Sequence, residues 1–203
     1  MATSAKSLNL ETSKKMFEAS KRVSPGGLLG VRNPNFYVPG EYPMFYTRGY
    51  DGHVVDVDGN DYIDLMCAFG PIILGYNETE ISKALYERME EGFCFTMCQN
   101  IQNELLEKLC ELIPCAEMGL LGKSGSDATT MAARISRAYT GKKKILRCGY
   151  HGWHDWCVEH DSSVPKEFAD LTIGFPYNDL EALEFLLKQN KDEVAAIFIA
   201  PVM

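Results

Sequence analysis

The sequence predicts an α/β protein with a mostly parallel sheet, and three observations support this. From residue 77 onward, short apolar runs alternate with segments of helical periodicity. The run VAAIFIAPV, residues 194–202, is apolar throughout, which is typical of a strand buried on both faces. Earlier in the chain, HVVDVDGNDYIDLM, residues 53–66, contains two β-like runs around Asp58-Gly59-Asn60, which predicts a β-hairpin.

The first part of the chain predicts one helix before this hairpin. Residues 10–23, LETSKKMFEASKRV, have an amphipathic pattern that ends at Ser24-Pro25-Gly26-Gly27. A loop rich in proline, glycine and aromatic residues follows. The acidic residues of the hairpin suggest calcium, but an EF-hand with its glycine at 59 would need its first ligand at position 54, which is valine. We therefore expect no calcium site there.

The second part predicts alternating helices and strands. We expect helices over 78–92, 100–114, 126–139 (ending at Gly141) and 178–189 (capped by Asn178), and strands over 143–149 and 194–202. In the 126–139 helix, Met131, Ile135 and Ala138 share one face. The chain stops after a predicted buried strand, so we expect the front part of a larger fold. We divide it into an N-terminal segment, 1–65, and the first part of a large domain, 66–203.

The composition excludes several classes of function. Twenty basic and 28 acidic residues among 203 give a net charge of −8, which disfavours nucleic acid as a partner. The N-terminus has no apolar core of a secretory signal, and the longest apolar run contains Pro201 and is too short to cross a membrane. Seven irregularly spaced cysteines predict reduced thiols of a cytoplasmic protein, mostly packed in the core.

The stretch GLLGKSGSDATT, residues 119–130, is a candidate phosphate-binding loop. It resembles the end of a nucleotide-binding P-loop, but the first glycine of that pattern would stand at position 117, which is Glu117. Ser124-Gly125-Ser126 precedes a well-patterned helix, where free N–H groups, hydroxyls and a glycine favour an anion. The alternative is that one serine only caps the helix. The pattern leaves both interpretations open.

The second candidate is CGYHGWHDWC, residues 148–157, which follows a predicted strand. Loops at the carboxyl ends of parallel strands are where α/β sheets bind ligands. Tyr150 offers a ring for stacking, His151 a hydrogen-bonding imidazole, and Gly152 room for close approach. Two alternatives stay open: an aromatic loop that only packs, and a zinc site, although C-x2-H-x2-H-x2-C is not a usual zinc spacing.

Together these segments resemble the class III pyridoxal-phosphate (PLP) aminotransferases, most closely the glutamate-1-semialdehyde aminomutase group. The resemblance rests on SPGG…VR, VVDVDGNDYIDLMCAFGPIILGY, KSGSDA, GYHGWHD and AAIFIAPV, which occur in the family's order over roughly residues 10 to 203. It implies fold type I, PLP as the cofactor, and amino-group transfer as a transaminase or aminomutase on a small carboxylate-bearing amino compound. It also implies a homodimer, since fold-type I enzymes complete the phosphate site with a partner's loop.

The resemblance assigns roles to particular residues. Ser124, Gly125 and Ser126 would hold the phosphate, Tyr150 would stack on the pyridine ring, and His151 and Gly152 would complete that wall. Arg32 would face the substrate carboxylate, and Phe69 would line the substrate pocket. No metal is implied.

The chain also departs from the family's pattern. Lys123 replaces the family's Asn, Ala200 replaces the Glu of E-P-V, and the catalytic lysine belongs to the family's second half. We therefore expect no catalytic residue in this chain. The alternative is a truncated or degenerate family member that acts as a binding or dimerisation module.

Overall fold

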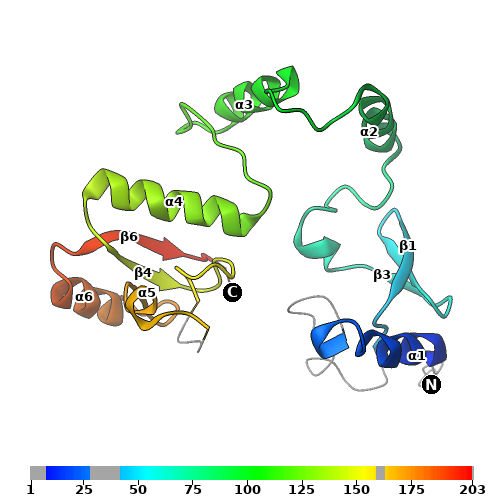
Figure 1. The fold of residues 1–203 in the computed structure, drawn as a ribbon, viewed down its shortest axis with the longest axis horizontal. Coiled ribbons are helices and arrows are strands. Elements are labelled where there is room, and N and C mark those ends of the chain that lie inside the picture. Colours follow the sequence, from blue (N-terminus) through cyan, green and yellow to red (C-terminus); the bar gives the residue numbers. More distant parts are fainter. Residues whose placement is uncertain (1–7, 28–41, 159–162, 203) are drawn as a thin grey trace, which may run out of the picture. The chain divides into compact units, whose positions relative to one another are not determined.

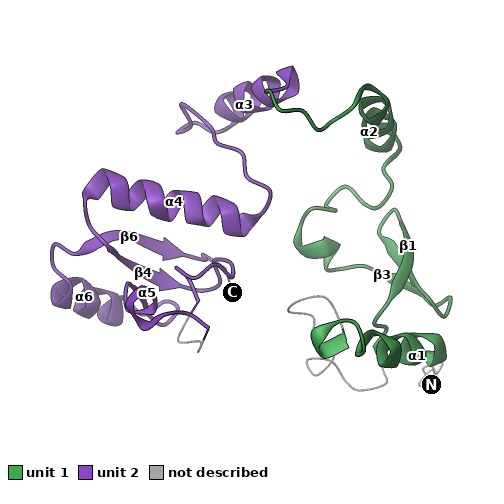
Figure 2. Cartoon of the chain, in the orientation of Figure 1, with its two compact units in different colours: residues 1–97 green, residues 98–203 purple. Residues whose placement is uncertain are grey.

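A computed structural model describes residues 8–27, 42–158 and 163–202. The chain divides into two compact units, residues 1–97 and 98–203, which are coloured separately in Figure 2. Each unit is described by itself. The domain boundary expected at residue 65 remains a prediction. No helix within the described ranges has the length and apolar character that a bilayer crossing requires.

The N-terminal unit contains the predicted helix and hairpin (Figure 1). Its elements are α1 (Glu11–Ser20), β1 (Tyr46–Tyr50), β2 (His53–Asp56), β3 (Asp61–Ile63) and α2 (Thr79–Glu91), with short 3-10 turns at Pro25–Gly27 and Cys67–Phe69. The strands form an antiparallel sheet in the order β1-β2-β3. Strand β1 lies where a loop was expected, because a glycine and two adjacent polar residues in YTRGY obscure its strand pattern.

The acidic residues of the hairpin have structural partners. Asp56, which is 1% exposed, accepts hydrogen bonds from the N–H groups of Asp58 and Asn60 at 2.9 and 2.8 Å. Asp58 accepts hydrogen bonds from the N–H groups of Thr12 and Ser13 at 2.7 and 2.8 Å, and so caps the start of α1. These carboxylates therefore fix the turn and tie it to the first helix.

The C-terminal unit has the predicted α/β character (Figure 1). Its elements are α3 (Asn100–Leu112), α4 (Gly125–Thr140), β4 (Lys144–Cys148), α5 (Lys166–Ala169), β5 (Thr172–Gly174), α6 (Leu180–Gln189) and β6 (Val194–Ile199). The sheet is parallel, in the order β5-β4-β6. Elements α5 and β5 were not predicted from the sequence, because each is too short to show a period.

The core of this unit lies around β4. Ile145 and Leu146 are fully buried, and Ala133 of α4 packs with Ile145, Trp156 and Cys157 in one cluster. The helix thus contacts the sheet through Ala133, whereas Ile135 on the face predicted to be apolar is 61% exposed.

Two details of the predicted strands and helices were wrong. The prediction that the last strand is buried on both faces fails within the described residues, because Ile197 and Ile199 of β6 are 40% and 52% exposed. The cap of α6 is Asp179, whose carboxylate accepts a hydrogen bond from the N–H of Ala182 at 2.8 Å. Asn178 instead adopts a left-handed conformation with φ of +57°, which turns the chain before the helix.

The cysteines pack differently from the expectation. All seven are free thiols, but only Cys148 and Cys157 are buried. Cys94, Cys98 and Cys115 are exposed. The interpretation of the cysteines as core filler was therefore wrong for most of them.

Candidate cofactor site

The N-terminus of α4 is built by a reciprocal cap. The Ser124 hydroxyl accepts a hydrogen bond from the N–H of Asp127 at 3.2 Å, and the Asp127 carboxylate accepts one from the N–H of Ser124 at 2.9 Å. The Ser124 hydroxyl also donates to that carboxylate at 2.9 Å. The hydrogen bond from the Ser124 hydroxyl is the main reason why the pKa of Asp127 lies below its usual value. Ser124 therefore has the capping role that the sequence left open.

The next two residues keep free donors at this turn. Within the described parts of the chain, the N–H groups of Gly125 and Ser126 and the Ser126 hydroxyl have no hydrogen-bond partner. A Cβ added at Gly125 would meet no atom within 4 Å, so there is open space beside these donors. The 16-residue helix behind them directs the positive end of its dipole toward that space. Such a turn fits a phosphate monoester.

The loop after β4 presents an aromatic ring. Tyr150 is 71% exposed, so its ring is accessible for stacking. His151 is fixed: its Nε2 lies 2.9 Å from the carbonyl oxygen of Cys148, and its ring meets the edge of Phe198 with centroids 5.8 Å apart. Because a carbonyl oxygen only accepts, Nε2 of His151 carries the proton. The loop therefore combines an anchored histidine with an open tyrosine.

The structure brings these two segments together. Gly152 has φ of +114°, and a Cβ at this position would lie 2.5 Å from Oγ and 3.0 Å from Cα of Ser126. The Thr129 hydroxyl on α4 lies 2.7 Å from the carbonyl oxygen of His151. The predicted phosphate turn and the predicted ring-stacking loop are thus adjacent, as a single ligand with a phosphate and a ring requires.

The zinc alternative has no support in this geometry. The Nδ1 of His154 lies 2.8 Å from the Thr130 hydroxyl, and the Cys157 thiol donates to the carbonyl oxygen of His154 at 3.2 Å. A metal-binding group of histidine, cysteine and acidic residues does not occur in the described ranges. The threonines 129 and 130 were missed by sequence reasoning, because a threonine inside a helix pattern gives no signal of a partner on a distant loop.

The two departures from the family's pattern lie at the margins of this site. Lys123 is exposed and directly precedes the cap of α4. Ala200 follows β6, and its N–H donates to the carbonyl oxygen of Cys148 at 2.9 Å. Its methyl group therefore stands at the strand end where the resemblance implies a carboxylate.

The predicted substrate residues belong to the other unit. Arg32 lies outside the described residues. Phe69 is 63% exposed and lies in a run of three left-handed residues, 67–69. It lines a cavity of about 530 Å³ that also contains Asp64 and Tyr76. The Tyr76 hydroxyl donates to Asp64 at 2.7 Å, and this hydrogen bond and burial raise the pKa of Tyr76 to about 12. The role of Phe69 at a substrate stays a prediction.

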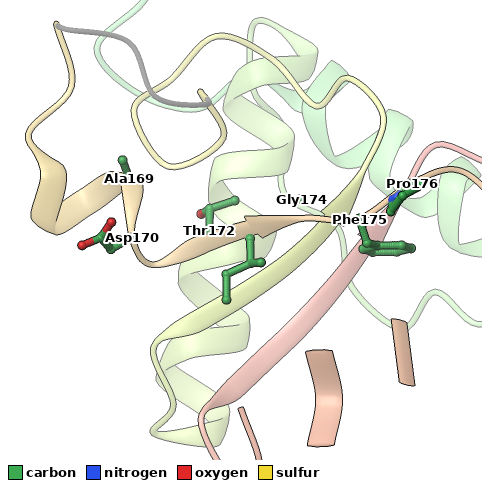
Figure 3. Close-up of a pocket in the computed structure, with 7 residues that line it drawn as sticks. Ala169, Asp170, Thr172, Gly174, Phe175 and Pro176 are labelled. Atoms are coloured by element: carbon green, nitrogen blue, oxygen red, sulfur yellow. The ribbon is translucent and has the colours of Figure 1, made fainter. Parts of the chain in front are cut away.

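A second hollow, of about 620 Å³, lies along β5 (Figure 3). Ala169 and Asp170 lie at one end of this strand, and Phe175 and Pro176 lie at the other. Neither hollow includes the residues of α4 or of the 150–152 loop that were predicted to bind the cofactor. The residues predicted to hold the phosphate, Ser124, Gly125 and Ser126, therefore lie outside both hollows.

Comparison with known proteins gives a consistent result. Residues 37–203 match the family model for class-III aminotransferases. The chain is 53% identical over 199 residues to the 3-aminobutyryl-CoA aminotransferase of Cloacimonas acidaminovorans, covering 98% of this chain and 48% of that protein. It is 35% identical over 211 residues to the glutamate-1-semialdehyde 2,1-aminomutase of Methanocaldococcus jannaschii, covering 97% and 48%.

A solved structure agrees with these sequence matches. The FumI protein of Sphingopyxis sp. MTA144, determined in a form with PLP, superposes with a TM-score of 0.85 at 33% identity, over 92% of this chain and 45% of that one. The chain spans about half the length of the curated relatives it matches.

Proposed function

Because this chain belongs to the class III aminotransferases, whose cofactor is PLP, we propose that the protein transfers amino groups with PLP bound between α4 and the 150–152 loop. The observation that carries this proposal is the pairing of free donors at Gly125 and Ser126 with the accessible ring of Tyr150. The 53% identity to an aminotransferase disfavours a module without catalysis.

Each residue of this site would have a defined role. The N–H groups of Gly125 and Ser126, with the Ser126 hydroxyl, would bind the phosphate, while Ser124 holds the turn through its cap. Tyr150 would stack on the pyridine ring, and His151 and Gly152 would complete the wall beside it. PLP supplies the electron sink through which the amino group is transferred. The chain's residues thus anchor and orient the cofactor.

We infer that the lysine that binds the cofactor covalently lies outside residues 1–203. The cofactor residues identified here supply phosphate contacts, stacking and orientation, but no amine. We also propose that the protein is a cytoplasmic homodimer. Phe93, Phe95 and Met97, between α2 and α3, are 64%, 58% and 80% exposed, and a patch of this kind is often covered by a partner.

The relatives suggest two substrate classes, which differ at the carboxyl group. A glutamate-1-semialdehyde-like substrate carries a free carboxylate, which Arg32 would bind in a bidentate fashion. A 3-aminobutyryl-CoA-like substrate carries a neutral thioester at that place. The 53% identity favours a 3-amino compound of the second type, whereas the expected role of Arg32 favours the first.

The experiment uses the full-length gene product that contains residues 1–203, reconstituted with PLP. It is offered free 3-aminobutyrate, its CoA thioester and glutamate-1-semialdehyde, each with and without a 2-oxo acid as the amino acceptor. A transaminase forms more than one equivalent of product per cofactor only with the acceptor, whereas an aminomutase isomerises glutamate-1-semialdehyde without one. If neither these amines nor a wider panel of primary amines reacts, although PLP binds, the proposed amino-group transfer is wrong.

A further inference from the structure

Two adjacent threonines on α4 contact the loop after β4, and they contact different parts of it. Thr129 Oγ1 lies 2.7 Å from the carbonyl oxygen of His151 and 3.1 Å from that of Ser126. Thr130 Oγ1 accepts a hydrogen bond from the Trp156 indole N–H at 2.8 Å and lies 2.8 Å from Nδ1 of His154. Thr129 therefore contacts the half of the loop that carries Tyr150, and Thr130 contacts the other half.

The Thr129 hydroxyl fixes the orientation of one peptide plane. A hydroxyl has a single proton, and the shorter distance directs it mainly to the carbonyl oxygen of His151. That carbonyl belongs to the peptide that joins His151 to Gly152, and the φ of +114° at Gly152 holds the same peptide from its other end. Tyr150 comes one residue earlier, directly before His151. Holding the His151 carbonyl therefore restrains the backbone that carries the Tyr150 ring.

We propose that Thr129 is a positioning residue for the cofactor. Its hydroxyl sets the separation between the phosphate turn at Ser126 and the ring of Tyr150, so that one ligand reaches both. This inference rests on the proposed function, because it takes PLP as the ligand of this site. Thr129 itself does not touch the cofactor; it acts through the loop.

The test compares three variants of the full-length gene product. Thr129→Val removes the hydroxyl and keeps the shape, Thr129→Ser keeps the hydroxyl, and Thr130→Val is the matched control on the same helical turn. Thr130→Val leaves the Trp156 N–H without its acceptor beside the buried cluster, so it destabilises the fold at least as much as Thr129→Val. The measurements are the urea midpoint, the PLP dissociation constant of the apoprotein, and the circular dichroism band of the bound cofactor.

Thr129→Val should weaken PLP binding by about 2- to 10-fold, the effect of one lost hydrogen bond, and should change the cofactor band. Thr129→Ser should restore both, and Thr130→Val should lower the urea midpoint but keep the cofactor band. The inference is overturned if Thr129→Val keeps the wild-type affinity and band, or if Thr130→Val reproduces its effects. If the wild-type protein binds no PLP, the proposed function fails together with the inference. If the wild type binds PLP and only the Thr129 result is negative, the inference alone fails.

Discussion

Replacing Gly152 by alanine should separate the loop from the phosphate turn. The new Cβ would lie 2.5 Å from Oγ of Ser126, which can rotate away, but also 3.0 Å from its Cα and Cβ, which cannot. Overpacking of this kind costs about 1–3 kcal/mol. The φ of +114° adds strain of about 1–3 kcal/mol for any residue with a Cβ. We therefore expect Gly152→Ala to lower the free energy of unfolding by about 2–6 kcal/mol.

The assay is urea unfolding of the full-length gene product, combined with PLP titration. With a slope of about 1–3 kcal/mol per molar urea, the loss should shift the midpoint by about 0.7 M or more. Gly141→Ala is the control, because Gly141 has φ of +68° and no atom within 4 Å of an added Cβ. Gly141→Ala should lower the free energy of unfolding by about 1–2 kcal/mol, the strain of a left-handed backbone at alanine, and should keep the PLP affinity of the wild type. If Gly152→Ala lowers the urea midpoint and the PLP affinity no more than Gly141→Ala does, the close contact between the loop and the phosphate turn is refuted.

Four further predictions follow from the same geometry and the inferred assembly. Gly125→Ala should leave the fold as stable as the wild type or more stable, since its Cβ enters open space in a helix, yet it should weaken PLP binding; unchanged binding would show that the phosphate does not approach this turn. Asp127→Asn should destabilise the protein at neutral pH but not below the pKa of Asp127. Because the pKa of this carboxylate is lowered in the folded state, the carboxylate stabilises the fold above its unfolded-state pKa of about 3.9. This stabilisation disappears as the pH falls through the folded-state pKa. A difference in the urea midpoint that is constant with pH would contradict that role. Borohydride reduction of residues 1–203 with PLP should label no single lysine, so one stoichiometric label, for example on Lys123, would contradict our inference about the covalent lysine. Phe95→Asp in the full-length gene product should give monomers with weakened cofactor binding, and a sedimentation experiment that still shows dimers with normal affinity would place Phe95 in the protein's own core.

Local patterns predicted much of the fold, because they reflect local physics. The helix α4 was expected from its apolar spacing and the glycine after it, and Gly141 does adopt the left-handed cap with φ of +68°. The hairpin was expected from its turn residues. Burial was harder to predict: the apolar pattern of β6 suggested burial on both faces, whereas Ile199 is 52% exposed among the described residues, because burial depends on tertiary packing that no local pattern encodes.

The candidate site shows the same division between local and tertiary information. Ser124 was expected as a cap or a phosphate ligand. Its spacing from Asp127 is a local signal of the cap that the structure contains, and its role at a phosphate stays a prediction. The contact of Gly152 with Ser126 and the hydrogen bond of Thr129 join segments more than 20 residues apart. Such contacts depend on how the loop after β4 folds back onto α4, which the sequence pattern does not contain.

The most direct test of this account is a crystal structure of the full-length gene product with PLP bound. The account predicts phosphate oxygens within about 3.2 Å of the backbone nitrogens of Gly125 and Ser126, and the Tyr150 ring stacked on the pyridine ring. A cofactor whose phosphate is held elsewhere, with the start of α4 facing only solvent or other protein atoms, would contradict it.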